Sequence, residues 1–208
     1  MKRLTLILLF LLTGCALHSP KIQPITAPVS AVQIVRGSVA RLTLETSGGT
    51  YTCTAWSLAP RKFVTAAHCT DALEMYPDGR LMLDGRPAFI LKEDDVTDLA
   101  ILIADLVKPG LDIRTVVLDI GESVTAMGFG YGFTAPLLTR HTVQILNYTI
   151  SPEIYPGTIF MGGFIGGMSG GPVFDINGDV VGVVQRGTEQ IGYGVNTATL
   201  LEFLMEAS

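Results

Sequence analysis

From residue 31 onward the chain is a succession of short apolar or alternating runs, each separated from the next by turn-forming residues. The runs are Val39–Thr46, Tyr51–Leu58, Lys62–Ala66, Ala88–Lys92, Leu99–Ile103, Ser123–Gly128, Thr142–Ile150, Pro172–Phe174, Val180–Gln185 and Gly192–Thr197. Many of them are rich in Val, Ile, Thr and aromatic residues, which favour strands. Only Ala198–Glu206 has a convincing helical pattern, with Thr197 and Thr199 as candidate N-caps. The pattern predicts an all-β fold of sandwich or barrel type.

Composition narrows the class of protein. The chain has 208 residues, 48% of them hydrophobic and 16% charged, which is typical of a folded protein with a sizeable core. Its net charge of −5 argues against a nucleic-acid partner, because such proteins usually carry a basic stripe. A break at Lys108-Pro109-Gly110 divides the body of the chain into two halves of similar size.

The N-terminus has the features of an export signal. A basic start is followed by the apolar run 4–12, which is too short to span a membrane as a helix, and then by Leu12-Thr13-Gly14-Cys15. These four residues resemble a bacterial lipobox, in which the Cys becomes lipidated and the signal is cut just before it. An ordinary secretory signal with a chance Cys is the alternative. The lipobox implies a signal peptide over residues 1–14, a lipid anchor at Cys15 and a place in the bacterial cell envelope. Ala16 favours the periplasmic face of the outer membrane by resemblance to other lipoproteins.

Residues 15–30 contain Pro20, Pro24 and Pro28. This spacing blocks a helix and favours an extended spacer. We therefore predict a Pro-rich tether over 15–30 and a folded domain over 31–208, with a loosely packed arm of the domain as the alternative for the tether.

The first motif of chemical interest is Val64-Thr65-Ala66-Ala67-His68-Cys69, in which His68 ends an apolar strand. If Cys15 carries lipid, Cys53 and Cys69 are the two remaining thiols, and an exported protein tends to pair them. A Cys53–Cys69 disulfide would fix the position of His68 as a general base.

The second motif is Asp98, placed directly before the apolar strand Leu99–Ile103. A general-base His needs a buried acceptor that sets its tautomer and stabilises its imidazolium form. Asp98 is suited to this role, although an acidic residue at this position is often only a turn residue, and Asp94 and Asp95 lie nearby.

The third motif is Gly166-Gly167-Met168-Ser169-Gly170-Gly171-Pro172-Val173. Small residues on both sides of one hydroxyl let a substrate backbone approach, and Gly can aim successive N–H groups at one point. Gly167–Gly171 also fits the G-x-S-x-G pattern of α/β-hydrolases. That fold requires a His after the Ser and a helix after the motif, and neither is present.

Together the three motifs resemble the trypsin/chymotrypsin family of serine proteases, especially its short bacterial members. The family order His, Asp, Ser occurs as His68, Asp98 and Ser169, and the resemblance covers roughly residues 31–206. It implies two antiparallel β-barrels, one over about 31–108 and one over about 111–197, closed by a short C-terminal helix over about 198–206.

The resemblance also implies roles for single residues. Ser169 would be the nucleophile, His68 the general acid and base, and Asp98 the group that orients His68. The N–H groups of Gly167 and Ser169 would form the oxyanion hole. The remaining implied positions bind substrate: Val183, Val184 and Gln185 as the strand against which a peptide pairs, and Gly192 in the pocket wall with residues near Gly163–Ile165.

Met168 departs from the family pattern, because trypsin-like zymogens have there an Asp that pairs with a newly cut N-terminus. Activation by N-terminal insertion is therefore not expected. No acidic residue lies around Gly162–Gly167, which disfavours cleavage after Lys or Arg. Apolar Phe164, Ile165 and Val184 point to a small or apolar pocket, while Arg186 could instead attract an acidic side chain.

We therefore predict a membrane-anchored extracytoplasmic serine endopeptidase that acts on protein or peptide substrates through an acyl-enzyme. The alternative is a catalytically latent or inactive lipoprotein of the same fold that binds peptides or a partner. We expect neither a metal site nor a cofactor, since no cluster of ligands at zinc-like spacing remains. We also expect the protein to be a monomer. His141 is interpreted as a surface or strand residue.

Overall fold

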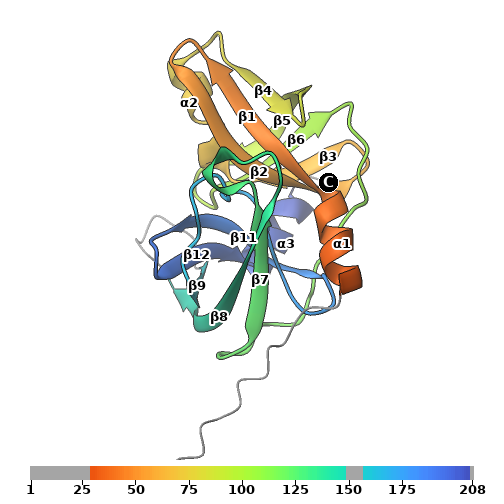
Figure 1. The fold of residues 1–208 in the computed structure, drawn as a ribbon, viewed down its shortest axis with the longest axis vertical. Coiled ribbons are helices and arrows are strands. Elements are labelled where there is room, and N and C mark those ends of the chain that lie inside the picture. Colours follow the sequence, from red (N-terminus) through yellow and green to blue (C-terminus); the bar gives the residue numbers. More distant parts are fainter. Residues whose placement is uncertain (1–28, 149–156, 207–208) are drawn as a thin grey trace, which may run out of the picture.

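The structure, a computed structural model, describes residues 29–148 and 157–206. Its strands close into two barrels of six strands each, with antiparallel pairing between neighbours (Figure 1). Barrel one contains, in cyclic order, β1 (Val39–Thr46), β2 (Gly49–Ala59), β3 (Lys62–Thr65), β6 (Leu99–Ala104), β5 (Arg86–Asp94) and β4 (Arg80–Leu83). Barrel two contains β10 (Pro172–Phe174), β11 (Val180–Gly187), β12 (Ile191–Asn196), β9 (Gly157–Met161), β8 (Leu137–Tyr148) and β7 (Ser123–Gly128). The predicted fold class is confirmed.

Each barrel has its own apolar interior, and a third cluster joins the two barrels. Trp56, Val64 and Leu99 of barrel one pack in this shared cluster, and Met127 and Phe174 of barrel two belong to the same cluster. All five side chains are fully buried. The two barrels are therefore held together by a continuous core, and residues at their contact have little freedom to shift.

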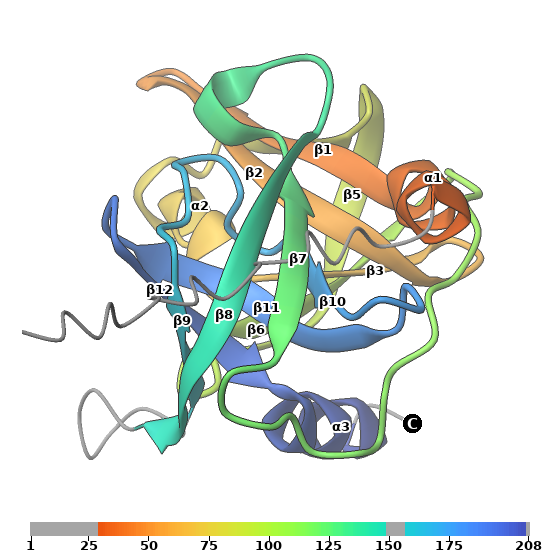
Figure 2. The same cartoon turned by 60° about the horizontal axis from the view of Figure 1, so that its bottom comes forward.

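Two longer helices flank the barrels. The C-terminal helix α3 (Thr197–Met205) packs Leu200 and Phe203 into the shared cluster. Its N-cap is Asn196, whose side chain accepts a hydrogen bond from the N–H of Thr199, so neither Thr197 nor Thr199 caps it. Figure 2 shows α3 at the end of barrel two and α1 beside β1.

Helix α1 (Val29–Ser38) was not expected from the sequence. Val29, Val32, Ile34 and Val35 have low helix propensity, and the helix buries only a narrow stripe through Ala31, Val35 and Ser38. Packing of Val35 into the shared cluster decides in favour of the helix. The predicted signal peptide (1–14) and the predicted tether up to residue 28 lie outside the described residues, whereas the last two tether residues begin α1.

The remaining elements are short. They are the 3-10 turns η1 (Ala67–Cys69) and η2 (Gly130–Gly132) and the helix α2 (Ala72–Met75). The strands β4 and β9, of four and five residues, were not singled out in the sequence. Within the described ranges, no helix is long and apolar enough to cross a membrane.

Candidate active site

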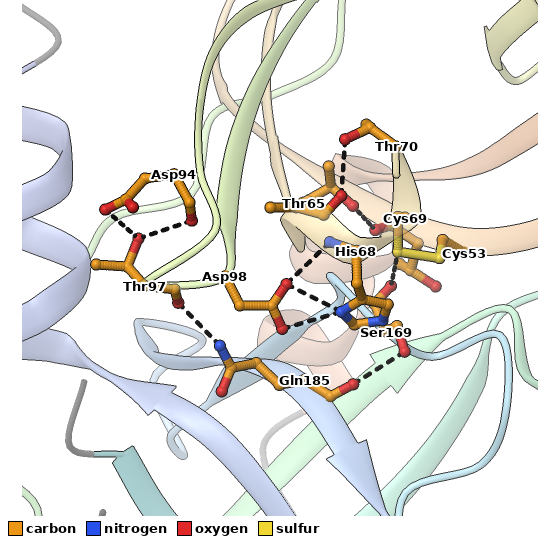
Figure 3. Close-up of polar contacts among 12 residues, drawn as sticks. Cys53, Thr65, His68, Cys69, Thr70, Asp94, Thr97, Asp98, Ser169 and Gln185 are labelled. Carbon is orange, nitrogen blue, oxygen red and sulfur yellow. Dashed lines mark hydrogen bonds and ion pairs between the residues drawn. A yellow bond between two sulfur atoms is a disulfide. The ribbon is translucent and has the colours of Figure 1, made fainter. Parts of the chain in front are cut away.

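His68 and Asp98 come together because their strands are neighbours. Thr65, at the end of β3, pairs with Ala100 near the start of β6, so η1, which carries His68, meets the turn that delivers Asp98. The Asp98 carboxylate lies 2.9 and 3.0 Å from His68 Nδ1, and it also accepts the backbone N–H of His68 at 2.9 Å (Figure 3). A carboxylate on Nδ1 requires the proton there, which leaves Nε2 of the neutral ring as an acceptor.

The Asp98 turn is built to hold one orientation. Asp98 is only 5% exposed and has a φ of 53°, a left-handed conformation that Asp tolerates better than most residues. Asp94 accepts hydrogen bonds from the N–H of Val96 and the hydroxyl of Thr97 and so shapes the turn. Gln185 of β11 donates from Nε2 to the Thr97 carbonyl at 2.9 Å, which ties the turn to barrel two.

Further negative charge lies near His68. Partial burial and, next, the charge of Asp95 raise the pKa of Asp71, and the charges of His68 and Asp98 also act on it. Asp71 therefore lies close enough to His68 and Asp98 for their charges to act on one another.

The predicted disulfide is confirmed. Cys53 of β2 and Cys69 of η1 are bonded, with their Cα atoms 6.1 Å apart. The bridge attaches the turn of His68 to β2. Both sulfur atoms lie within 4.8 Å of a ring nitrogen of His68, but sulfur in a disulfide is not the thiolate that binds metal ions, so this trio is a poor metal site.

Ser169 lies beside His68 at the contact between the barrels (Figure 3). Its hydroxyl donates to the carbonyl of Gln185 at 3.0 Å. Among the described residues no hydrogen bond joins Ser169 to His68. The structure thus brings the three predicted residues together, with the Ser169 hydroxyl hydrogen-bonded to Gln185.

In the loop that leads to Ser169, every backbone carbonyl from Ile165 to Ser169 accepts a hydrogen bond. The five bonds are Met168 N to Ile165 O (2.9 Å), Tyr131 N to Gly166 O (2.7 Å), Thr54 Oγ1 to Gly167 O (2.8 Å), Gly171 N to Met168 O (2.9 Å) and Thr54 N to Ser169 O (2.8 Å). In a trans peptide the N–H points away from the C=O of the same unit. The N–H of Gly167 therefore points away from Tyr131, and that of Ser169 away from Gly171. Neither donates to an acceptor in the described part of the chain.

Glycines permit this loop shape. Gly167 has a φ of 96°, and a Cβ on it would lie 2.5 Å from the Phe129 carbonyl oxygen. Gly170 has a φ of 79°, and a Cβ there would lie 2.2 Å from the Thr65 hydroxyl oxygen. Any larger residue at either position would displace barrel backbone or the loop itself.

Met168 anchors the loop in barrel two. Its side chain is fully buried in a cluster that includes Phe160, Phe164 and Val184. Met168 is thus held by apolar packing, at the position where trypsin-like zymogens have an Asp that forms an ion pair. The loop shape depends on this burial and on the hydrogen bonds above.

The predicted substrate-binding residues are placed differently from one another. Val183 and Val184 are buried, and their backbones already pair with β12 on one side and with Pro172 and Gly171 on the other. A peptide cannot pair with them for this reason. Gln185 lies at a register shift of β11, and Arg186 and Gly187 pair only with β12 within the described residues, so the free edge of the strand is Gln185–Gly187.

Gly192, the fourth predicted position, lies opposite Gly187 on β12. A Cβ on Gly192 would lie 2.7 Å from the ring of Phe164, and one on Gly187 would lie 3.0 Å from the Phe164 backbone nitrogen. Phe164 itself is 7% exposed. Its ring therefore closes the space beside these two glycines.

His141 is a buried member of β8, not a surface residue. It is 3% exposed, Nδ1 lies 2.9 Å from the Gly162 carbonyl oxygen and Nε2 lies 2.6 Å from the Thr139 hydroxyl. Its ring contacts that of Phe164 edge-on, with 4.6 Å between centroids. Burial lowers the pKa of His141 and keeps it neutral. The interpretation of His141 as a strand residue is confirmed, and the alternative of a surface residue is wrong.

Thr54 and Tyr131 were not foreseen either. A Thr within a β-strand and a Tyr beside Gly are ordinary in sequence, so no local signal marks them. Their importance arises from contacts over long sequence separations, 113 residues for Thr54 and Gly167.

Two closed barrels with His68, Asp98 and Ser169 at their contact define the architecture of a chymotrypsin-like serine protease. The trypsin-like peptidase domain matches residues 53–183 in sequence. The chain belongs to this family and is a serine endopeptidase by class, with protein or peptide substrates.

Solved structures show the same fold. The Rv3671c protease, in its inactive form, is 20% identical with a TM-score of 0.73, over 89% of this chain and 96% of that one; an active form, from M. tuberculosis, gives the same identity and TM-score. Deg5 is 20% identical with a TM-score of 0.73, over 84% of this chain and 90% of that one. The HtrA-type protease AlgW, solved with a tripeptide, is 22% identical with a TM-score of 0.69, over 85% of this chain and 62% of that one. No curated protein matches the sequence.

Proposed function

We propose that the protein hydrolyses peptide bonds with Ser169 as nucleophile, His68 as general acid and base and Asp98 as the group that orients His68. The observation that carries the proposal is the shape of the loop before Ser169. Its carbonyls from Ile165 to Ser169 all accept hydrogen bonds, whereas the N–H groups of Gly167 and Ser169 donate to no acceptor among the described residues and can bind an oxyanion. Loss of one such donor typically costs about 10²–10³ in rate.

The chemistry begins when the Ser169 hydroxyl turns from the Gln185 carbonyl to Nε2 of His68. Oγ attacks the peptide carbonyl carbon while its proton passes to Nε2, and the oxyanion accepts hydrogen bonds from the N–H groups of Gly167 and Ser169. The imidazolium, stabilised by Asp98, then gives its proton to the amide nitrogen as the C–N bond breaks. A water molecule that gives its proton to Nε2 attacks the ester, and that proton returns to Oγ.

The substrate would lie extended along the free edge Gln185–Gly187 and add a strand to β11. Its side chain before the cut bond would then face the space beside Gly187 and Gly192. Because the Phe164 ring closes this space, we propose a preference for small aliphatic residues there.

The proposed setting is the periplasmic face of the outer membrane, with the chain anchored by lipid on Cys15. Support comes from Leu12-Thr13-Gly14-Cys15 and the disulfide, which suits an oxidising compartment. Mass spectrometry of the mature N-terminal peptide tests the anchor: the expected mass includes acyl chains on Cys15. Release of a Cys15→Ser variant from membranes would agree with it, and an unmodified Cys15 would contradict it.

The test of the enzyme uses the full chain, oxidised and in detergent, with a fluorophosphonate probe. Labelling at Ser169 is expected, should vanish in Ser169→Ala and should fall strongly in His68→Ala. A folded, oxidised protein that gives no adduct would point instead to the latent, peptide-binding alternative, for which the hydrogen bond from Ser169 to Gln185 is the specific observation.

A further inference from the structure

Thr54 of β2 is a fully buried polar residue at the contact between the barrels. Its N–H donates to the Ser169 carbonyl (2.8 Å), and its hydroxyl donates to the Gly167 carbonyl (2.8 Å) and accepts the N–H of Phe129 (2.9 Å). Its own carbonyl accepts the hydroxyl of Thr65 (2.8 Å). Every polar group of Thr54 is therefore used, and three of the four bonds reach barrel two.

These bonds fall on the peptide units that adjoin the two free N–H groups. The N–H of Gly167 is followed along the chain by the Gly167 carbonyl, which the Thr54 hydroxyl holds. The N–H of Ser169 is followed by the Ser169 carbonyl, which the Thr54 backbone holds. The N–H of Gly167 shares its own peptide unit with the Gly166 carbonyl, which Tyr131 holds, and the N–H of Ser169 shares its unit with the Met168 carbonyl, which Gly171 holds. Thr54 fixes the next unit in each case, so it limits rotation of the backbone on the C-terminal side of Gly167 and of Ser169.

The same hydroxyl also reaches the second support of the loop. Phe129, whose N–H it binds, directly precedes η2, and Tyr131 of η2 donates to the Gly166 carbonyl at 2.7 Å. A single oxygen atom thus connects the segment that holds Gly166 with the segment that contains Gly167. Loss of this oxygen would loosen both supports together.

The surrounding glycines fit a side chain at this position. A Cβ on Gly128 would lie 2.7 Å from the Thr54 hydroxyl oxygen, one on Gly170 would lie 2.3 Å from its carbonyl oxygen, and one on Gly171 would lie 3.2 Å from its methyl group. The hydroxyl must be both donor and acceptor, which Ser can reproduce and Val or Ala cannot. The methyl group only fills space.

We propose that Thr54 is a positioning residue through which barrel one holds the Ile165–Gly171 loop of barrel two, which carries the N–H groups of Gly167 and Ser169, in the shape that the structure shows. The inference rests on the proposed function, since it names the residue that keeps the proposed oxyanion hole formed. Thr54 acts through Gly167 and Ser169 and does not touch the substrate.

The kinetic consequence is specific. Hydrogen bonds to an oxyanion develop in the transition state, so a misplaced N–H group lowers kcat more than it raises KM. For Thr54→Val, which keeps the shape and removes the hydroxyl, we expect kcat to fall by about 10- to 100-fold, less than or equal to the loss of one donor. Thr54→Ser should retain most of the activity.

The experiment compares wild type, Thr54→Val, Thr54→Ser and a matched control in the full oxidised chain. The control is Thr158→Val, because Thr158 is also fully buried and its hydroxyl has no hydrogen-bond partner among the described residues. Measurements are kcat and KM on a peptide ester, fluorophosphonate labelling rates, and hydrogen exchange by mass spectrometry of peptides that cover 129–132 and 165–171.

The proposal expects faster exchange in both segments and a lower kcat in Thr54→Val alone. Wild-type exchange in Thr54→Val, or equal loss in Thr54→Ser and Thr158→Val, would overturn it. If the wild type neither turns over nor labels but Thr54→Val still exchanges faster in both segments, then the proposed enzyme fails and the holding role of Thr54 stands. The exchange readout thereby separates the two failures.

Discussion

Removal of the Cys53–Cys69 disulfide gives a quantitative test of how the His68 turn is stabilised. The bridge joins residues 16 apart in sequence. In the chain-entropy treatment, a closed loop of this size restricts the unfolded chain by about 3 kcal/mol at 25 °C. For a domain of 150–250 residues, each kcal/mol corresponds to about 2–4 °C in Tm. We therefore expect the double variant Cys53→Ala/Cys69→Ala to melt about 6–12 °C below the oxidised wild type.

The assay is differential scanning calorimetry at one pH and one scan rate. Wild type in the presence of a reductant is the matched control and should melt near the double variant, since both lack the same cross-link. The folded double variant should still label with fluorophosphonate at 25 °C, because Asp98 retains its bonds to the backbone N–H and Nδ1 of His68. A decrease in Tm of less than about 3 °C in both samples would refute the loop-entropy reasoning.

Three further outcomes are expected. Met168→Ala should lower the free energy of unfolding by about 2–5 kcal/mol in urea, because Met168 is fully buried; a change below about 1 kcal/mol would show that its packing does not anchor the loop. Burial lowers the pKa of His141 below its ordinary 6.5, so the unfolded chain takes up a proton first as the pH falls. The contribution of His141 to the free energy of unfolding should be greatest above about pH 6.5 and decrease below it. The Tm values at pH 7 and pH 5 should therefore differ less in His141→Gln than in wild type, and equal differences would contradict the burial of a neutral His141. Asp98→Asn should keep the fold and lower kcat by about 10⁴-fold, as in other triads with the wrong His tautomer; a loss below tenfold would remove Asp98 from its proposed role.

Much of the fold follows from local patterns in the sequence. The bounds of β1, β7 and β10 agree with the predicted runs because these strands alternate clearly or are fully apolar between turn signals. The helix α1 does not follow from local pattern, since β-branched residues disfavour it and only contact with both barrels supports it.

In the candidate site, too, some features follow from local sequence patterns and others do not. Residues with distinctive chemistry in a fixed order, such as His68 and Ser169, stand out in the sequence. The shape of the loop does not, because it depends on Thr54 and Tyr131, which are common residue types in unremarkable positions. For Val183 and Val184 the sequence did carry a signal, since an apolar strand run indicates burial. Their backbones pair with strands on both sides and therefore have no hydrogen-bonding groups left for a substrate.

The shared cluster between the barrels has a consequence for how the site is held together. His68 and Asp98 belong to the first half of the chain and Ser169 to the second, and the halves meet through a core that includes Phe203 near the end of α3. Lys92 of barrel one also donates to the Phe203 carbonyl at 2.9 Å. A chain without α3 lacks part of this core, so the two halves that supply His68, Asp98 and Ser169 are held together less firmly.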